Sequence, residues 1–112
     1  MNKLELVAEF VGYKLHYIDG NEFKTMPFYI HNDKYLKPKS IIRLDKGEKL
    51  EFDTDWNWLM LVVGTLAKTL PTIDNPELEY LKNELGFWMR HASIEKSFEY
   101  VVKLIEWYNE NK

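Results

Sequence analysis

The sequence predicts an α+β fold, in which a small antiparallel sheet packs against C-terminal helices behind a short N-terminal helix. Short runs of β-forming residues broken by turn residues fill positions 13–52. Apolar residues at helical spacing, with capping residues before them, fill 54–69, 76–85 and 93–110. A length of 112 residues is that of one domain. We therefore expect a single domain over 1–112.

The N-terminal segment predicts a helix over residues 3–11. Its apolar residues recur three or four positions apart, and Gly12 stands where a left-handed residue ends many helices. The residues of this apolar face are Leu4, Val7, Ala8 and Val11.

The predicted sheet consists of short runs separated by turns. Asp19 and Gly20 form a dipeptide that suits a tight hairpin turn. Pro27 and Pro38 cannot donate a ladder hydrogen bond, so we expect them at strand ends or on an edge. The runs are Tyr13–Ile18, Phe28–Ile30, Ile41–Leu44 and Leu50–Phe52.

The helix expected over 54–69 has a capping residue, Thr54 or Asp53, and is apolar at every position from Trp58 to Val63. A helix that is apolar on all sides must be covered on several sides. The pattern therefore predicts that this helix lies at the centre of the fold.

Two more helices follow. Asn75 and Pro76 provide a cap and a favourable first position for the helix over 76–85, and Gly86 is placed to end it. Residues 87–91 then fit a strand or an extended linker. Ser93 caps the last helix, whose main apolar stripe is Ile94, Phe98, Val101, Val102, Ile105 and Tyr108.

The last helix also carries a second apolar stripe. Tyr100, Leu104 and Trp107 follow each other at i, i+4 and i+7. In the helix expected over 54–69, Trp56 and Trp58 are about 200° apart around the helix axis, so these two side chains cannot share one face. We take Tyr100, Leu104, Trp107 and Trp58 as candidate partner-binding residues, because aromatic side chains dominate interface energetics. Burial of the stripe in the core of the same chain is an equal alternative.

Basic residues are concentrated in one part of the chain. Positions 24–49 hold seven basic residues against three acidic ones, whereas the whole chain has a net charge of −3. Interleaved aromatic residues would let stacking and phosphate contacts coexist there. Protection of strand edges by lysine explains the same charges and is the favoured interpretation. The candidate nucleic-acid contacts are Lys34, Lys37, Lys39 and Arg43.

Catalytic and metal motifs are missing from the sequence. The five glycines are too far apart for a phosphate-binding loop, and no serine lies in a nucleophile elbow. The absence of cysteine removes disulfides, thiolate metal sites and thiol nucleophiles. Asp53, Asp55 and Asn57 have the spacing of a calcium loop, but Trp58 and Gly64 break the pattern, which favours helix capping. We expect no metal and no cofactor.

Nothing in the sequence predicts export or a membrane span. Glu5 and Glu9 interrupt the apolar core that a signal peptide would need. The most apolar segment, 58–67, is shorter than the roughly 20 residues that cross a bilayer. We expect a cytoplasmic protein without a membrane partner.

Four segments resemble an uncharacterised group of short proteins from bacteria, their phages and mobile elements. The similar residues are Val7–Gly12, Trp56–Met60 with Val62 and Val63, Ser93–Glu95 and Ile105–Asn111. The chain departs from the group at Leu61, where proline is usual, and at Gly64–Leu66, where charged residues are usual. The resemblance implies a phage-like origin and no specific activity.

These observations favour a non-enzymatic binding protein that acts by protein–protein contact, with another protein or with a second copy as a homodimer. An inhibitor and an accessory factor are both consistent with this function. A nucleic-acid-binding accessory protein is the second hypothesis, and an enzyme is the third.

Overall fold

The computed structural model describes residues 2–17, 27–30, 41–43 and 48–112. Four helices have 9, 14, 15 and 18 residues, and three strands have three or four residues each. The elements in chain order are α1 (Lys3–Val11), β1 (Lys14–Tyr17), β2 (Pro27–Ile30), β3 (Ile41–Arg43), α2 (Trp56–Thr69), α3 (Pro76–Arg90) and α4 (Ile94–Asn111).

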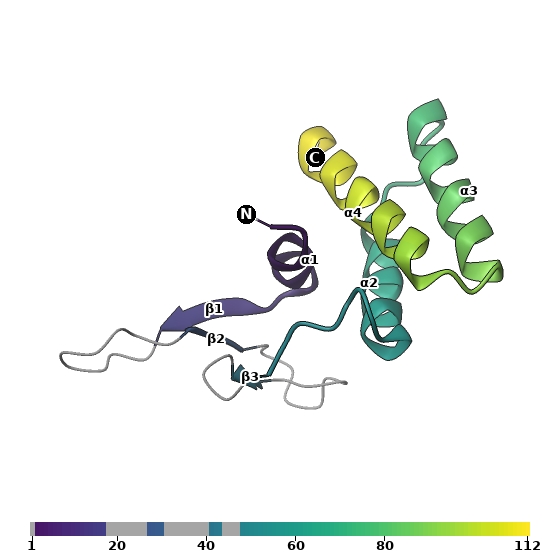
Figure 1. Ribbon diagram of the computed structural model, residues 1–112. Coiled ribbons are helices and arrows are strands. Elements are labelled where there is room, and N and C mark those ends of the chain that lie inside the picture. The colour runs from purple at the N-terminus through teal and green to yellow at the C-terminus, as the bar shows by residue number, and fades with distance from the viewer. Residues whose placement is uncertain (1, 18–26, 31–40, 44–47) are drawn as a thin grey trace.

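The predicted α+β class is wrong, because the described part of the chain is a small, predominantly helical fold. The helices pack on one another: α1, α2 and α3 all contact α4, and α1 also contacts α2. In Figure 1 the strands lie beside α1, while α3 lies at the opposite end of the molecule. Strands of three or four residues offer too little surface to cover helices of up to 18 residues. The amphipathic helix faces are therefore buried mainly against each other.

The three strands pair antiparallel in the order β1-β2-β3. Pro27 is the first residue of β2, at the strand end where proline was expected. Leu50–Phe52 was predicted to be a strand, but these residues lead through a turn toward α2, and Phe52 is buried in the core. The predicted turn at Asp19 and Gly20 and the position of Pro38 lie outside the described residues.

The central helix is α4 rather than α2. α4 contacts the other three helices (Figure 1). Its buried side chains come from both of its apolar stripes. The prediction that the helix now labelled α2 lies at the centre of the fold, covered on several sides, is wrong, because Met60 is 46% exposed and Gly64 is exposed. α2 buries one face, which consists of Trp58, Leu59, Val62 and Leu66.

The helix boundaries follow local capping chemistry at most ends. Gly12 ends α1 with φ 106°, and the side chain of Ser93 accepts a hydrogen bond from the Lys96 amide at the start of α4, so both predictions are confirmed. The cap of α2 is Asp55, whose Oδ1 accepts from the Asn57 amide at 2.8 Å. Thr54 and Asp53, the predicted caps, precede it.

α3 continues five residues beyond its predicted end. Gly86 lies inside the helix, which runs to Arg90, so the strand or linker expected over 87–91 is wrong. A helical glycine costs about 1 kcal/mol relative to alanine. Leu85 is buried and Met89 packs against the core, and these contacts offset that cost. The turn into α4 follows at Ala92, whose φ is 54°.

We expect the stability of the protein to fall as the pH rises from about 10 to about 12. Burial raises the pKa of Tyr13 from 10.0 to about 12. In this interval the unfolded chain loses the Tyr13 proton while the folded chain keeps it, so the equilibrium moves toward unfolding. Urea unfolding of the wild type and of Tyr13→Phe at pH 9, 10 and 11 measures this contribution. An equally steep loss of stability in the variant would show that Tyr13 does not cause it.

Candidate functional site

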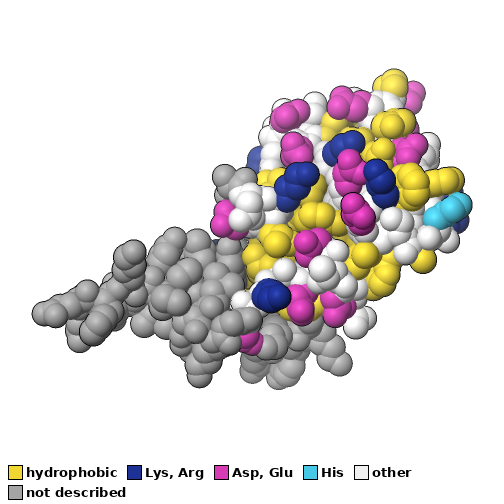
Figure 2. Space-filling model, viewed as in Figure 1, with side chains coloured by type: hydrophobic (Ala, Val, Ile, Leu, Met, Phe, Trp, Pro, Cys, Tyr) yellow, Lys and Arg dark blue, Asp and Glu magenta, His cyan; other side chains and the backbone are white. Residues whose placement is uncertain are grey.

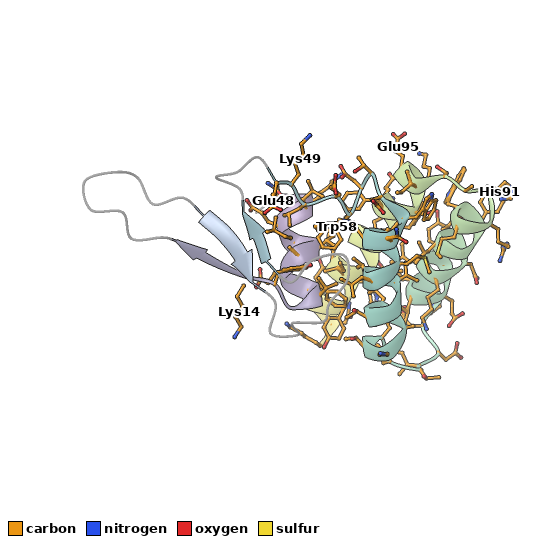
Figure 3. The ribbon with its side chains drawn as sticks, turned by 90° about the horizontal axis from the view of Figure 1, so that it is seen from below. Lys14, Glu48, Lys49, Trp58, His91 and Glu95 are labelled. Atoms are coloured by element: carbon orange, nitrogen blue, oxygen red, sulfur yellow. The ribbon has the colours of Figure 1, made fainter. Side chains whose placement is uncertain are left out.

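Three of the four candidate partner-binding residues lie in the core. Trp58, Leu104 and Trp107 are 4%, 1% and 5% exposed, so they are not available to a partner on the folded surface. Trp58 lies between the helices (Figure 3), where it makes an edge-to-face contact with Phe52 at 5.1 Å between ring centroids. Within the second stripe of α4, Leu104 and Trp107 are buried, and α3 packs beside the stripe. For Leu104 and Trp107 the burial agrees with the core alternative.

Tyr100, the fourth candidate, is partly exposed beside α3. Its ring contacts Tyr80 edge to face at 6.5 Å. A side-chain hydrogen bond with Tyr80 is the main cause that raises the pKa of Tyr100 to about 12, and the carboxylates of Glu84 and Glu99 act in the same direction. Tyr100 is therefore neutral near pH 7.

The basic candidates are only partly within the described structure. Lys34, Lys37 and Lys39 lie outside it, and Arg43 ends β3 opposite Phe28. Over the described helices, the face in Figure 2 shows lysine and arginine interspersed with acidic side chains. That face has no continuous basic patch among the described residues. Nucleic-acid binding through these four residues stays a prediction.

The Asp53, Asp55 and Asn57 cluster is explained by helix capping, because Asp55 accepts the Asn57 amide directly. His91 lies at the outer end of the α3–α4 hairpin (Figure 3), where its ring stacks on Phe87 with centroids 4.2 Å apart. Within the described residues, no three His, Asp or Glu side chains are grouped so that they could hold a metal ion. None of the described helices is both long enough and apolar enough to cross a membrane.

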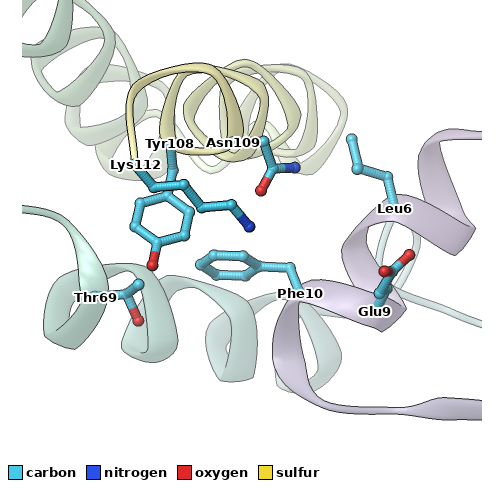
Figure 4. A pocket seen from close by; sticks show the side chains of 7 residues that line it. All are labelled: Leu6, Glu9, Phe10, Thr69, Tyr108, Asn109 and Lys112. Carbon is cyan, nitrogen blue, oxygen red and sulfur yellow. The ribbon is translucent and has the colours of Figure 1, made fainter.

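One surface pocket, of about 440 Å³, lies where α1 and the ends of α2 and α4 meet (Figure 4). Phe10 and Tyr108 form an edge-to-face pair there, with ring centroids 5.9 Å apart. The Lys112 ammonium lies 5.7 Å from the centroid of the Tyr108 ring. Glu9 and Thr69 add polar groups, so the lining is mixed. Its aromatic groups are already engaged with each other and with Lys112.

A second pocket is a groove between α2 and α3, of about 340 Å³. We call it the α2–α3 groove. Leu104 of α4 lies among its lining residues, and Lys82 is the only ionisable side chain of the lining. The full lining is Val63, Leu66, Ala67, Leu70, Thr72, Lys82, Leu85, Gly86, Met89 and Leu104.

The groove exists because α2 and α3 both pack on α4 and have few contacts with each other. Two positions on its walls leave space: Ala67 on α2 has a small side chain, and Gly86 on α3 has none. A larger residue at either position would narrow the space. The groove is therefore an apolar surface that the described residues leave uncovered, and it is the candidate functional site.

Sequence reasoning missed this groove. Its α2 wall belongs to the helix that was expected at the centre of the fold, and its α3 wall includes Gly86 and Met89, which were placed at or beyond the helix end. The sequence did contain one sign of this groove. α2 has more apolar residues than its buried face contains, because Val63 and Ala67 lie away from that face.

Comparisons with family models, curated proteins and solved structures gave no match to this chain.

Proposed function

We propose that this protein is a non-enzymatic binding protein that acts by protein–protein contact, and that the α2–α3 groove receives an apolar segment of the partner. The observation that carries the proposal is the lining of the groove, in which Thr72 and Lys82 are the only polar side chains. Apolar pockets of about 300 Å³ or more with a few polar groups are typical binding sites.

The same lining supports binding rather than catalysis. General acid–base or nucleophilic chemistry needs at least two groups within hydrogen-bond reach of a reacting atom. Lys82 is the one ionisable side chain in the groove, and the hydroxyl of Thr72 is the only other side-chain polar group. The groove lining has no carboxylate or imidazole beside these two groups.

The proposal includes a phage or mobile-element origin and a cytoplasmic location. The origin is supported by the resemblance of Trp56–Met60 and Ile105–Asn111 to the phage-associated group, and the location by the absence of cysteine. Nucleic-acid binding is the second candidate function. The excess of basic residues over positions 24–49 supports this second candidate. No contact among the described residues adds to that support.

A single substitution in the groove tests the proposal. Ala67→Glu places a carboxylate in the apolar lining at an exposed helical position, so it should block binding while the helix stays folded. Immobilised wild type and variant are incubated with a bacterial lysate, and bound proteins are compared by quantitative mass spectrometry. We expect at least one protein that the wild type retains about tenfold more strongly than Ala67→Glu.

The matched control is Asn83→Glu, which adds the same charge at an exposed position of α3 outside the groove lining. It should retain the same protein as the wild type. If a second copy of the chain occupies the groove, sedimentation will show a concentration-dependent dimer that Ala67→Glu abolishes. Equal capture and equal self-association by all three proteins would contradict a role of the groove in binding.

A further inference from the structure

The two rims of the α2–α3 groove differ in charge. On α3, Lys82, Gly86 and Arg90 follow one another at spacings of four residues and so form one stripe along the helix. Lys82 lines the groove, and Nη1 of Arg90 lies 3.7 Å from the place that a Cβ at Gly86 would take. The Arg90 guanidinium therefore lies beside the groove wall. The α3 rim carries two cations.

These two cations have no carboxylate partner within the described part of the chain. The ion pairs recorded on the helices join Lys96 and Lys103 to Glu99, on α4. The α2 rim, in contrast, presents Val63, Ala67 and Leu70 on successive turns and has no charge in the lining. A ligand in the groove would thus meet positive charge along one side only.

We infer that the α2–α3 groove binds an amphipathic helix of a partner protein that carries acidic residues along one flank. This inference rests on the proposed function and specifies its partner. Both walls of the groove are helices, and the minimal side chains at Ala67 and Gly86 allow close approach of a third helix. Its apolar stripe would face Val63, Ala67 and Met89, the groove-lining residues that are exposed or half-buried, as in other helix-in-groove complexes.

The spacing of the two cations sets the spacing of the acidic residues. Lys82 and Arg90 are eight residues apart, which is about 12 Å along a helix axis. A partner helix lying along α3 therefore needs two carboxylates seven or eight positions apart on the flank that faces α3. A fatty acid would supply only one carboxylate, so the pair of cations favours a helix over a lipid.

Designed peptides test the inference on the full chain. The probe is an 18-residue helical peptide with leucines at i, i+3, i+4 and i+7 and two glutamates eight positions apart beside them. A second peptide has glutamine at both places. Fluorescence anisotropy should show that the wild type binds the glutamate peptide about 5- to 20-fold more tightly, as expected for two partly exposed ion pairs. This preference should shrink as salt is added.

The variants identify the cations. In Lys82→Gln/Arg90→Gln the preference for the glutamate peptide should disappear, whereas Lys68→Gln/Lys103→Gln, which removes two charges outside the groove lining, should keep it. If both peptides bind equally and Ala67→Glu abolishes the binding, the acidic partner is wrong and the groove function stands. If neither peptide binds, or if oleate binds in the groove and the peptides do not, the inferred helical partner is wrong. The lysate comparison then decides the proposed function separately.

Discussion

Replacing Trp107 with alanine is expected to lower the free energy of unfolding by about 3–5 kcal/mol and to leave the association state unchanged. The indole is 5% exposed and belongs to the core formed where the other helices meet α4. Removing it deletes a large buried apolar surface and leaves a cavity that helices fixed at their ends cannot fully close. Urea unfolding and sedimentation of the same samples measure the two quantities.

The control for Trp107→Ala is Glu106→Ala, one residue earlier on the solvent side of α4. It should change the stability by no more than about 0.5 kcal/mol. Since small domains are often stable by only about 5–15 kcal/mol, Trp107→Phe provides a milder variant that still folds and should lose less. A stable Trp107→Ala protein with weakened self-association would instead restore the interface alternative for the second stripe.

The parts of the fold that depend on neighbours in sequence were predictable. Gly12 ends α1 and Ser93 begins α4 as expected, because each cap is made by groups within four residues. The long apolar stripe of α4 was equally clear. In each case the free energy that decides the structure comes from a local hydrogen bond or from one helix face.

The parts that depend on packing between distant segments were not predictable. Gly86 resembles a helix end in the sequence, yet α3 continues because Leu85 and Met89 pack against the core on the same face. The second stripe of α4 was visible, but the sequence did not show that α3 packs beside it. The α2–α3 groove arises only because α2 and α3 both pack on α4 and have few contacts with each other. No local sequence pattern encodes this arrangement of the two helices.

The apolar run of α2 makes the distinction between the buried side and the exposed side of this helix directly measurable. Leu59→Ala is expected to lower the free energy of unfolding by about 2–4 kcal/mol, because Leu59 is fully buried on the face that contacts α4 and α1. Met60→Ala, the adjacent change, should cost less than about 0.5 kcal/mol, because Met60 is 46% exposed. Both variants keep a good helix former, so helix propensity contributes little to the difference. Urea midpoints of the two variants measure it. Similar losses at both positions would mean that Met60 is packed as tightly as Leu59, which would contradict the exposed side of α2 described above.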